Sequence, residues 1–171
     1  MNLTIRRETA KDYDTVYQVV KAAFDSAEHS DGNEQDLIVA LRKGPSYIPE
    51  LALVACSGGK IIGHIMFTRI DIGGSPELAL APLAVLPDFQ RQGVGSALVR
   101  EGHRIAAELG FGYSVVLGSA RYYPKFGYAP ASQFQIRAPF EVPEENFMAV
   151  RLCETAEPVA GTVRYDQAFG I

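Results

Sequence analysis

A run of glycine, glutamine and arginine near the middle of the chain has the composition of a phosphate-binding loop. It reads Gln90-Arg91-Gln92-Gly93-Val94-Gly95 and stands between an apolar stretch and a segment with helical periodicity. Free backbone amides at a helix start, with the helix dipole behind them, attract phosphate oxygens. Gly93 and Gly95 allow a diphosphate to approach the backbone, and Arg91 adds a positive charge. We therefore predict that residues 91–96 bind a phosphate-bearing ligand.

Two common nucleotide-binding loops do not fit this segment. A nucleoside-triphosphate loop needs a terminal Gly-Lys-Ser/Thr, which the segment lacks. A dinucleotide fingerprint needs a third glycine three residues after Gly95, where Leu98 stands. A nucleotide-binding enzyme that uses this loop is therefore only a secondary alternative.

A second segment supplies hydroxyl groups that can move protons. It reads Ser119-Ala120-Arg121-Tyr122-Tyr123-Pro124-Lys125-Phe126-Gly127-Tyr128. A tyrosine stays protonated at neutral pH and can donate its proton to a leaving group. Both adjacent tyrosines, Tyr122 and Tyr123, are able to do this, and the alternative is that both only pack on a short helix.

Together the two segments resemble the GCN5-related N-acetyltransferase (GNAT) superfamily. The first resembles its acetyl-CoA signature, Gln/Arg-x-x-Gly-x-Gly/Ala, and Leu83-Ala84-Val85 followed by Pro87 resembles the family's fourth strand. The second resembles a marker in which a tyrosine, here Tyr123, lies four residues before Gly-Phe/Tyr. The resemblance covers roughly residues 3–152 and is closest to the YhbS-like predicted acetyltransferases.

This resemblance implies a co-substrate, acetyl-CoA, and a set of residues that bind it. The fourth strand of the family carries a bulge, here expected at Pro82, and splays from the fifth strand, so that the pantetheine arm pairs with free backbone groups in the gap. The implied acetyl-CoA contacts are Leu83, Ala84, Val85, Gln90, Arg91, Gln92, Gly93, Val94, Gly95, Ser96, Ser119 and Tyr123.

The implied reaction is direct attack of an acceptor's primary amine on the thioester. Tyr123 is the predicted general acid, Tyr122 is the second candidate, and the amide of Leu83 or Val85 is the predicted oxyanion donor. A non-catalytic acyl-CoA-binding or sensor domain on the same fold is the alternative function. The acceptor itself has no recognisable code, and we expect residues 26–33 and 134–147 to shape its pocket.

The sequence does not single out a base for the attacking amine. His64 follows Gly63 in an apolar strand, which is more typical of a structural histidine, and His103 is predicted to face solvent from the middle of a helix. Deprotonation through water, without a dedicated side chain, is a further alternative. The candidate bases are Glu28, His29, Glu34, His64 and Glu77.

The elements that must position these residues follow the order β-α-α-β-β-β-α-β-α-β-β. Apolar spacing predicts helices after a capping box at residues 9–12, after residues 31–34 and from the glycine loop to about residue 109, with a short helix over 121–126. The predicted strands are 5–8, 51–56, 61–70, 78–85, 113–117, 134–136 and 147–152, with a hairpin turn at 57–60 and a break at 71–76.

This order is not a strict strand–helix alternation, so a purely parallel sheet is not expected. We predict an α/β fold: a mixed, mostly antiparallel central sheet of about 6–7 strands with helices on both faces. By the resemblance it is a GNAT fold with splayed fourth and fifth strands. A single N-acetyltransferase domain over residues 1–171 is expected, with its core motifs in 78–128 and a tail that packs on the body.

The composition indicates which kinds of partner and which compartment to expect. The 171 residues are 47% hydrophobic and carry a net charge of −4, which argues against a nucleic-acid partner. No apolar run is long enough for a membrane span, and Cys56 and Cys153 show no metal-ligand spacing, so we expect a cytoplasmic protein without a metal. A monomer or a homodimer is equally compatible with the sequence.

Overall fold

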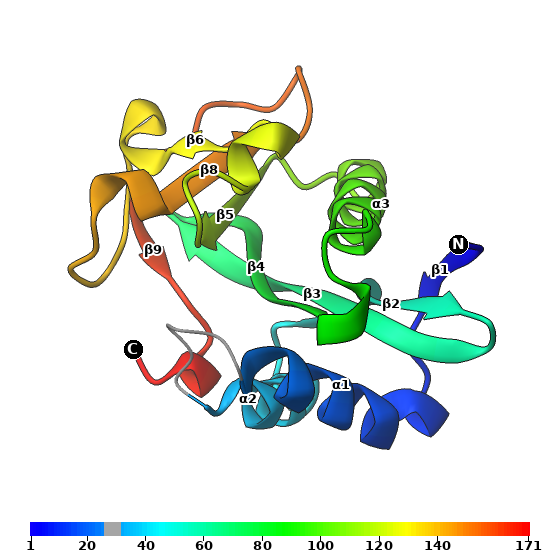
Figure 1. Ribbon diagram of the computed structural model, residues 1–171. Coiled ribbons are helices and arrows are strands. Elements are labelled where there is room, and N and C mark those ends of the chain that lie inside the picture. Colours follow the sequence, from blue (N-terminus) through cyan, green and yellow to red (C-terminus); the bar gives the residue numbers. More distant parts are fainter. Residues whose placement is uncertain (26–31) are drawn as a thin grey trace.

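A mixed β-sheet forms the centre of the protein (Figure 1), and the computed structural model describes residues 1–25 and 32–171. The order across the sheet is β1-β2-β3-β4-β5-β8-β6, and β9 joins it by pairing with β3 and β7. β4 runs parallel to β5, and β7 parallel to β9. The strands are β1 Leu3–Arg7, β2 Tyr47–Ser57, β3 Lys60–Ile72, β4 Ser75–Val85, β5 Tyr113–Leu117, β6 Ala129–Pro130, β7 Ile136–Arg137, β8 Phe147–Arg151 and β9 Gly161–Arg164.

Helices cover both faces of this sheet (Figure 1). α1 (Tyr13–Asp25) and α2 (Glu34–Arg42) pack on one face, over a cluster that includes Val54, Met66 and Ala84. α3 (Val94–Glu108) packs on the other face. The predicted mixed, mostly antiparallel α/β fold is therefore confirmed. None of the helices in residues 1–25 and 32–171 is long and apolar enough to cross a membrane.

The parallel strands β4 and β5 separate soon after they meet. Their paired positions are Leu78 with Ser114 and Ala79 with Val115, whereas β4 continues to Val85. The edge of β4 over residues 80–85 therefore faces β5 without a ladder. The predicted splay between these two strands is present, and it leaves backbone groups of β4 available to a ligand.

A bulge in β4 lies at the start of this splayed segment. On the β3 side, Ile65 pairs with Leu83 and Phe67 pairs with Leu80, so two residues of β4, Ala81 and Pro82, lie opposite one residue of β3. Proline has no N–H to give to a ladder, and an unpaired extra residue suits it. The bulge expected at Pro82 is confirmed.

A glycine sets the distance between α3 and the sheet. A Cβ built on Gly102 would lie 2.2 Å from a ring carbon of Phe67, so no larger residue fits there without a shift. The ring of Phe67 on β3 therefore fills the space that a side chain at position 102 would need. This close packing places the start of α3 beside the splayed segment of β4.

Two predicted boundaries are wrong. The break expected at 71–76 is only a two-residue turn, because Gly73 and Gly74 take positive φ (59° and 89°) and both strands run up to them. The strand expected at 134–136 is not continuous: Phe134 ends a 3₁₀ helix (Ala131–Phe134), Gln135 at φ 61° follows as its C-cap, and only Ile136 belongs to a strand, β7. The tail does pack on the body, since β9 pairs with β3 and β7.

Candidate active site

A cavity of about 540 Å³ opens where β4 ends and α3 begins. Its wall combines the splayed end of β4, the loop that follows, the first turn of α3 and the tyrosine-rich segment after β5. The lining residues are Leu83, Val85, Phe89, Gln90, Arg91, Gly93, Gly95, Ser96, Tyr122 and Lys125. The cavity therefore joins two features that the sequence places apart, the glycine loop and the tyrosine pair.

The first turn of α3 presents free backbone amides to this cavity. Gly93 is the N-cap residue at φ 86°, and having no side chain it cannot cap the helix. The amide of Ala97 already donates to the carbonyl of Gly93 (3.0 Å), but the amides before it have no acceptor one turn earlier in the helix. The amides of residues 94–96, together with the helix dipole, are thus able to attract an anion.

The loop before α3 is held in shape by its own side chains. Gln90 Nε2 donates to the carbonyl of Val85 (3.1 Å), and Gln92 Nε2 donates to the carbonyl of Asp88 (3.2 Å). Arg91 has φ 62°, a left-handed conformation that is strained for a residue with a side chain. The two glutamines therefore shape the loop, while Arg91 brings a positive charge to the cavity wall.

The remaining residues of the predicted acetyl-CoA set take several positions. Leu83 and Val85 line the cavity, whereas Ala84 between them packs on the opposite face of the sheet. The side chain of Val94 is buried in the core below the cavity. Ser119 Oγ accepts from the amides of residues 121 and 122, so its side chain caps the turn that carries the tyrosines.

Three residues of the cavity wall are absent from the predicted set of acetyl-CoA contacts. The Tyr122 hydroxyl lies above the first turn of α3, at 2.5 Å from where a Cβ on Gly95 would be. Lys125 Nζ lies 4.2 Å from the centroid of the Tyr122 ring and supplies a second positive charge. Phe89 completes the wall. The signal for Tyr122 and Lys125 was their place in the marker that contains Tyr123.

Tyr123 lies next to the cavity rather than on its lining. Its ring fills the space beside Gly118 at the end of β5, where a Cβ would come within 2.5 Å of a ring carbon. It meets Tyr122 and Tyr128 edge to face, with centroids 5.1 Å and 5.7 Å away. Burial raises the pKa of Tyr123 well above its usual value, so its hydroxyl stays protonated.

His103 does not face solvent, contrary to the sequence prediction. Its Nε2 lies 3.0 Å from the Tyr128 hydroxyl, which is also 2.8 Å from Ser114 Oγ on β5. Burial lowers the pKa of His103 to about 4, so it is neutral at pH 7. Its ring lies 6.0 Å from that of Phe67. The helical period alone could not show that Tyr128 reaches this face of α3.

The candidate bases among the described residues do not gather at the cavity. Glu77 is buried, with Oε1 accepting from the amides of Gly112 and Tyr113 (3.0 and 2.9 Å) and Oε2 from Ser75 (2.7 Å), so it holds the start of β5. Glu34 begins α2. Glu28 and His29 lie outside the described residues. His64 belongs to a different cluster.

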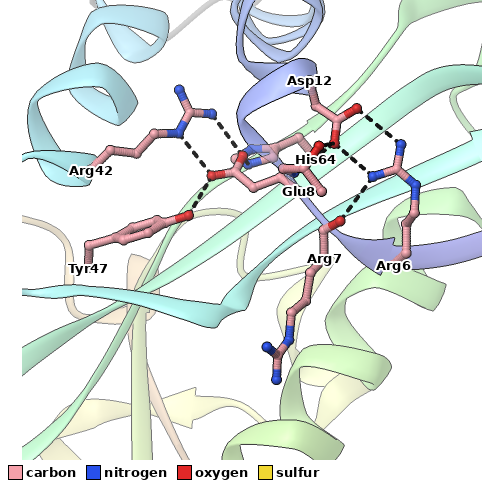
Figure 2. A network of polar contacts seen from close by, with 8 residues as sticks. Arg6, Arg7, Glu8, Asp12, Arg42, Tyr47 and His64 are labelled. Carbon is pink, nitrogen blue, oxygen red and sulfur yellow. Dashed lines mark hydrogen bonds and ion pairs between the residues drawn. The ribbon is translucent and has the colours of Figure 1, made fainter.

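Figure 2 shows that cluster, which is centred on Glu8. The Glu8 carboxylate has no solvent exposure and accepts from Arg42 Nη2 and Nε (2.8 and 2.9 Å), from Tyr47 Oη (2.8 Å) and from His64 Nε2 (3.1 Å). Burial alone would raise the pKa of Glu8, but the hydrogen bonds from His64 and Arg42 lower it to about 2. Sequence reasoning named only His64 of these four residues.

The fold and the cavity agree with the family that the sequence resembles, and comparison with known families identifies it. The chain belongs to the acetyltransferase (GNAT) family, whose model matches residues 13–128. The predicted family is therefore confirmed. In the part of the chain that the structure describes, histidine, cysteine and acidic residues form no group able to hold a metal ion.

Two relatives within the family are similar to this chain in sequence. The chain is 42% identical to the uncharacterized N-acetyltransferase YjhQ of Escherichia coli K12 over 118 residues, which are 66% of this chain and 65% of YjhQ. It is 33% identical to YhbS of the same organism over 70% of this chain and 74% of YhbS. The match to YjhQ thus spans less than two thirds of that protein.

Two solved structures share the whole fold. The E. coli YhbS structure in complex with CoA has a TM-score of 0.90 at 29% identity and covers 100% of this chain and 93% of its own. A GNAT acetyltransferase from Brucella melitensis in complex with acetyl-CoA has a TM-score of 0.80 at 30% identity, with 98% of both chains covered. The predicted similarity to YhbS-like acetyltransferases is confirmed.

Proposed function

We propose that this protein is an acetyl-CoA-dependent N-acetyltransferase that acts as one domain and acetylates a primary amine of an acceptor. One observation carries the proposal. A single cavity joins the free amides at the start of α3 to the splayed edge of β4. The structures of YhbS with CoA and of the Brucella enzyme with acetyl-CoA support the choice of co-substrate.

The cavity suits a diphosphate followed by an extended amide-bearing arm. The amides of residues 94–96 would accept the diphosphate, with Arg91 and Lys125 as counter-charges on the wall. The free edge of β4 would pair with the pantetheine amides as an added strand does. Gly93 and Gly95 keep side chains away from the backbone that the phosphates must reach.

Tyr123 is the proposed general acid. As the acceptor nitrogen bonds to the thioester carbon, negative charge grows on the carbonyl oxygen, and a β4 amide at Leu83 or Val85 is the proposed donor to it. The carbon–sulfur bond then breaks, and sulfur takes the proton of the Tyr123 hydroxyl. Its raised pKa keeps that proton available across the working pH range. The acceptor nitrogen loses its second proton to water as the amide forms, and water returns one proton to Tyr123, so that the protons balance.

We propose that water removes the proton of the attacking ammonium, without a dedicated base. Glu77 is committed to β5 and His64 to Glu8, so both have structural partners. The rate would then depend on the fraction of acceptor present as free amine.

The adjacent tyrosines allow a direct test, with CoA release measured against a panel of amines. Tyr123→Phe should lower kcat by about 10²–10⁴-fold, the usual contribution of a general acid, with acetyl-CoA affinity unchanged. Tyr122→Phe should instead weaken acetyl-CoA binding, because its hydroxyl lies in the cavity. A wild-type protein that binds acetyl-CoA but turns over no amine would favour the acyl-CoA sensor. Full activity of Tyr123→Phe with loss in Tyr122→Phe would move the acid by one residue.

A further inference from the structure

The cluster centred on Glu8, here the Glu8 network, takes no direct part in the reaction proposed above. Its presence needs a separate explanation. It places an ionised carboxylate and a guanidinium under the helices, with side-chain exposures of 0% for Glu8 and 8% for Arg42. Burying two charges carries a large desolvation cost that their attraction must offset, and apolar residues often stabilise such a site equally well. Stability alone is therefore a weak reason for this arrangement.

The network links side chains from five elements of the fold. Glu8 follows β1, Arg42 ends α2, Tyr47 begins β2 and His64 lies in β3 (Figure 2). The guanidinium of Arg42 also lies 3.9 Å from the ring centroid of Tyr13 at the start of α1. Both helices on this face of the sheet are thus fixed to the strands through one carboxylate.

On the sheet, the network ends beside the splayed segment of β4. His64 pairs directly with Ala84, and its neighbours in register are Ile65 with Leu83 and Gly63 with Val85. Leu83 and Val85 line the cavity and carry the amides proposed for the oxyanion. The position of His64 therefore influences the position of β4, the strand that must present those amides.

The protonation state of His64 follows from its partner. An ionised Glu8 only accepts hydrogen bonds, so His64 Nε2 carries the hydrogen that lies between them. Burial lowers the pKa of His64 despite the bond to Glu8, which leaves the ring neutral. Nδ1 is then a bare lone pair, buried and without a hydrogen-bond partner among the described residues. With no solvent access, Nδ1 cannot receive a proton from an acceptor, so His64 is not the base.

We infer that His64, held by Glu8, is a positioning residue that fixes the splayed segment of β4 for acyl transfer. The inference rests on the proposed function, because it assigns the network to the β4 amides of that reaction. The groups that face His64 are Glu8, Arg42 and, through Glu8, Tyr47; Tyr13 faces Arg42 from α1.

Three variants test this role, two at His64 and one at its neighbour in the sheet, Val54. His64→Phe removes the donor to Glu8, whereas His64→Gln offers an amide N–H in its place. Val54→Ala is the matched control, since Val54 pairs with His64 from the β2 side and is fully buried but makes no polar contact. We expect His64→Phe to lower kcat at least about tenfold with acetyl-CoA Kd changed less than twofold. His64→Gln should retain most of the rate, and Val54→Ala should lower only Tm.

A second measurement does not depend on turnover. Amide hydrogen exchange of Leu86, whose N–H donates to the carbonyl of Ile62 on β3 (2.9 Å), should become at least about tenfold faster in His64→Phe than in Val54→Ala. Faster exchange with no turnover even in the wild type would refute the proposed function and retain the positioning of β4. Three results overturn the inference: an unchanged kcat and exchange rate in His64→Phe, an equal loss in His64→Gln, or an equal loss in Val54→Ala.

Discussion

Two glycines with the same backbone conformation allow the diphosphate site to be tested without ambiguity about folding. Gly93 has φ 86° at the start of α3, and Gly74 has φ 89° in the remote turn between β3 and β4. A Cβ on either residue would meet no atom within 4 Å. Replacing each by alanine therefore imposes the same strain, about 1–2 kcal/mol for a left-handed residue, and no protein clash.

The two variants should differ only in acetyl-CoA binding. The open space around Gly93 is the cavity itself, so its new methyl group would hold a diphosphate away from the helix amides. Loss of one hydrogen bond to a charged group costs about 1.5–3 kcal/mol, which corresponds to a roughly 10–150-fold higher Kd. Gly74→Ala should show the same drop in Tm and an unchanged Kd.

Calorimetric titration with acetyl-CoA measures the Kd of both variants, and thermal unfolding measures their Tm. A Kd for Gly93→Ala within twofold of wild type, in a folded protein, would show that the diphosphate does not rest on this turn. An equal loss of affinity in Gly74→Ala would attribute the effect to general loosening.

Two further predictions concern pH. kcat/KM should rise with pH along the free-amine fraction of the acceptor, so two acceptors with different amine pKa values should shift the rising limb; a limb that stays at one pH for both would reveal a base on the protein. His103, with a pKa lowered to about 4, binds fewer protons in the folded than in the unfolded state between about pH 4 and 6.5. The free energy of unfolding should therefore fall as pH drops through that window, and chemical denaturation of His103→Gln should show a smaller fall, by at most about 3 kcal/mol. An identical pH dependence in both proteins would contradict that assignment.

The geometry of the loop proposed to bind phosphate could be predicted because its determinants are local. Positive φ at Gly93, free amides at a helix start and the charge of Arg91 lie within a few residues of one another. The bulge could also be predicted from a single residue, Pro82, because proline cannot donate to a ladder. The family resemblance then supplied the splay between β4 and β5, which no local pattern contains.

The buried polar contacts could not be predicted from local patterns. Glu8 and His64 are 56 positions apart, and Glu8 and Arg42 are 34 apart, so only the folded sheet brings them together. The same holds for His103 and Tyr128, which are 25 apart. A charged residue after an edge strand and a histidine in a helix are both most simply interpreted as solvated, and tertiary packing overrides that interpretation here.

The local contacts and the long-range contacts thus lie on opposite faces of β4 and have different roles. The face toward α3 and the cavity carries groups that would touch acetyl-CoA, and these depend on a short loop and on two close approaches, at Gly95 and Gly102. The opposite face carries Ala84, which is too small to fix the strand by its own packing. Its neighbour His64 is anchored instead by a carboxylate with four donors. A strand that gives up its ladder on one side to receive a ligand loses the hydrogen bonds that would otherwise hold it. Strong polar anchoring of the adjacent strand offsets that loss, and this explains why charge is buried beside the one segment of the sheet where β4 and β5 part.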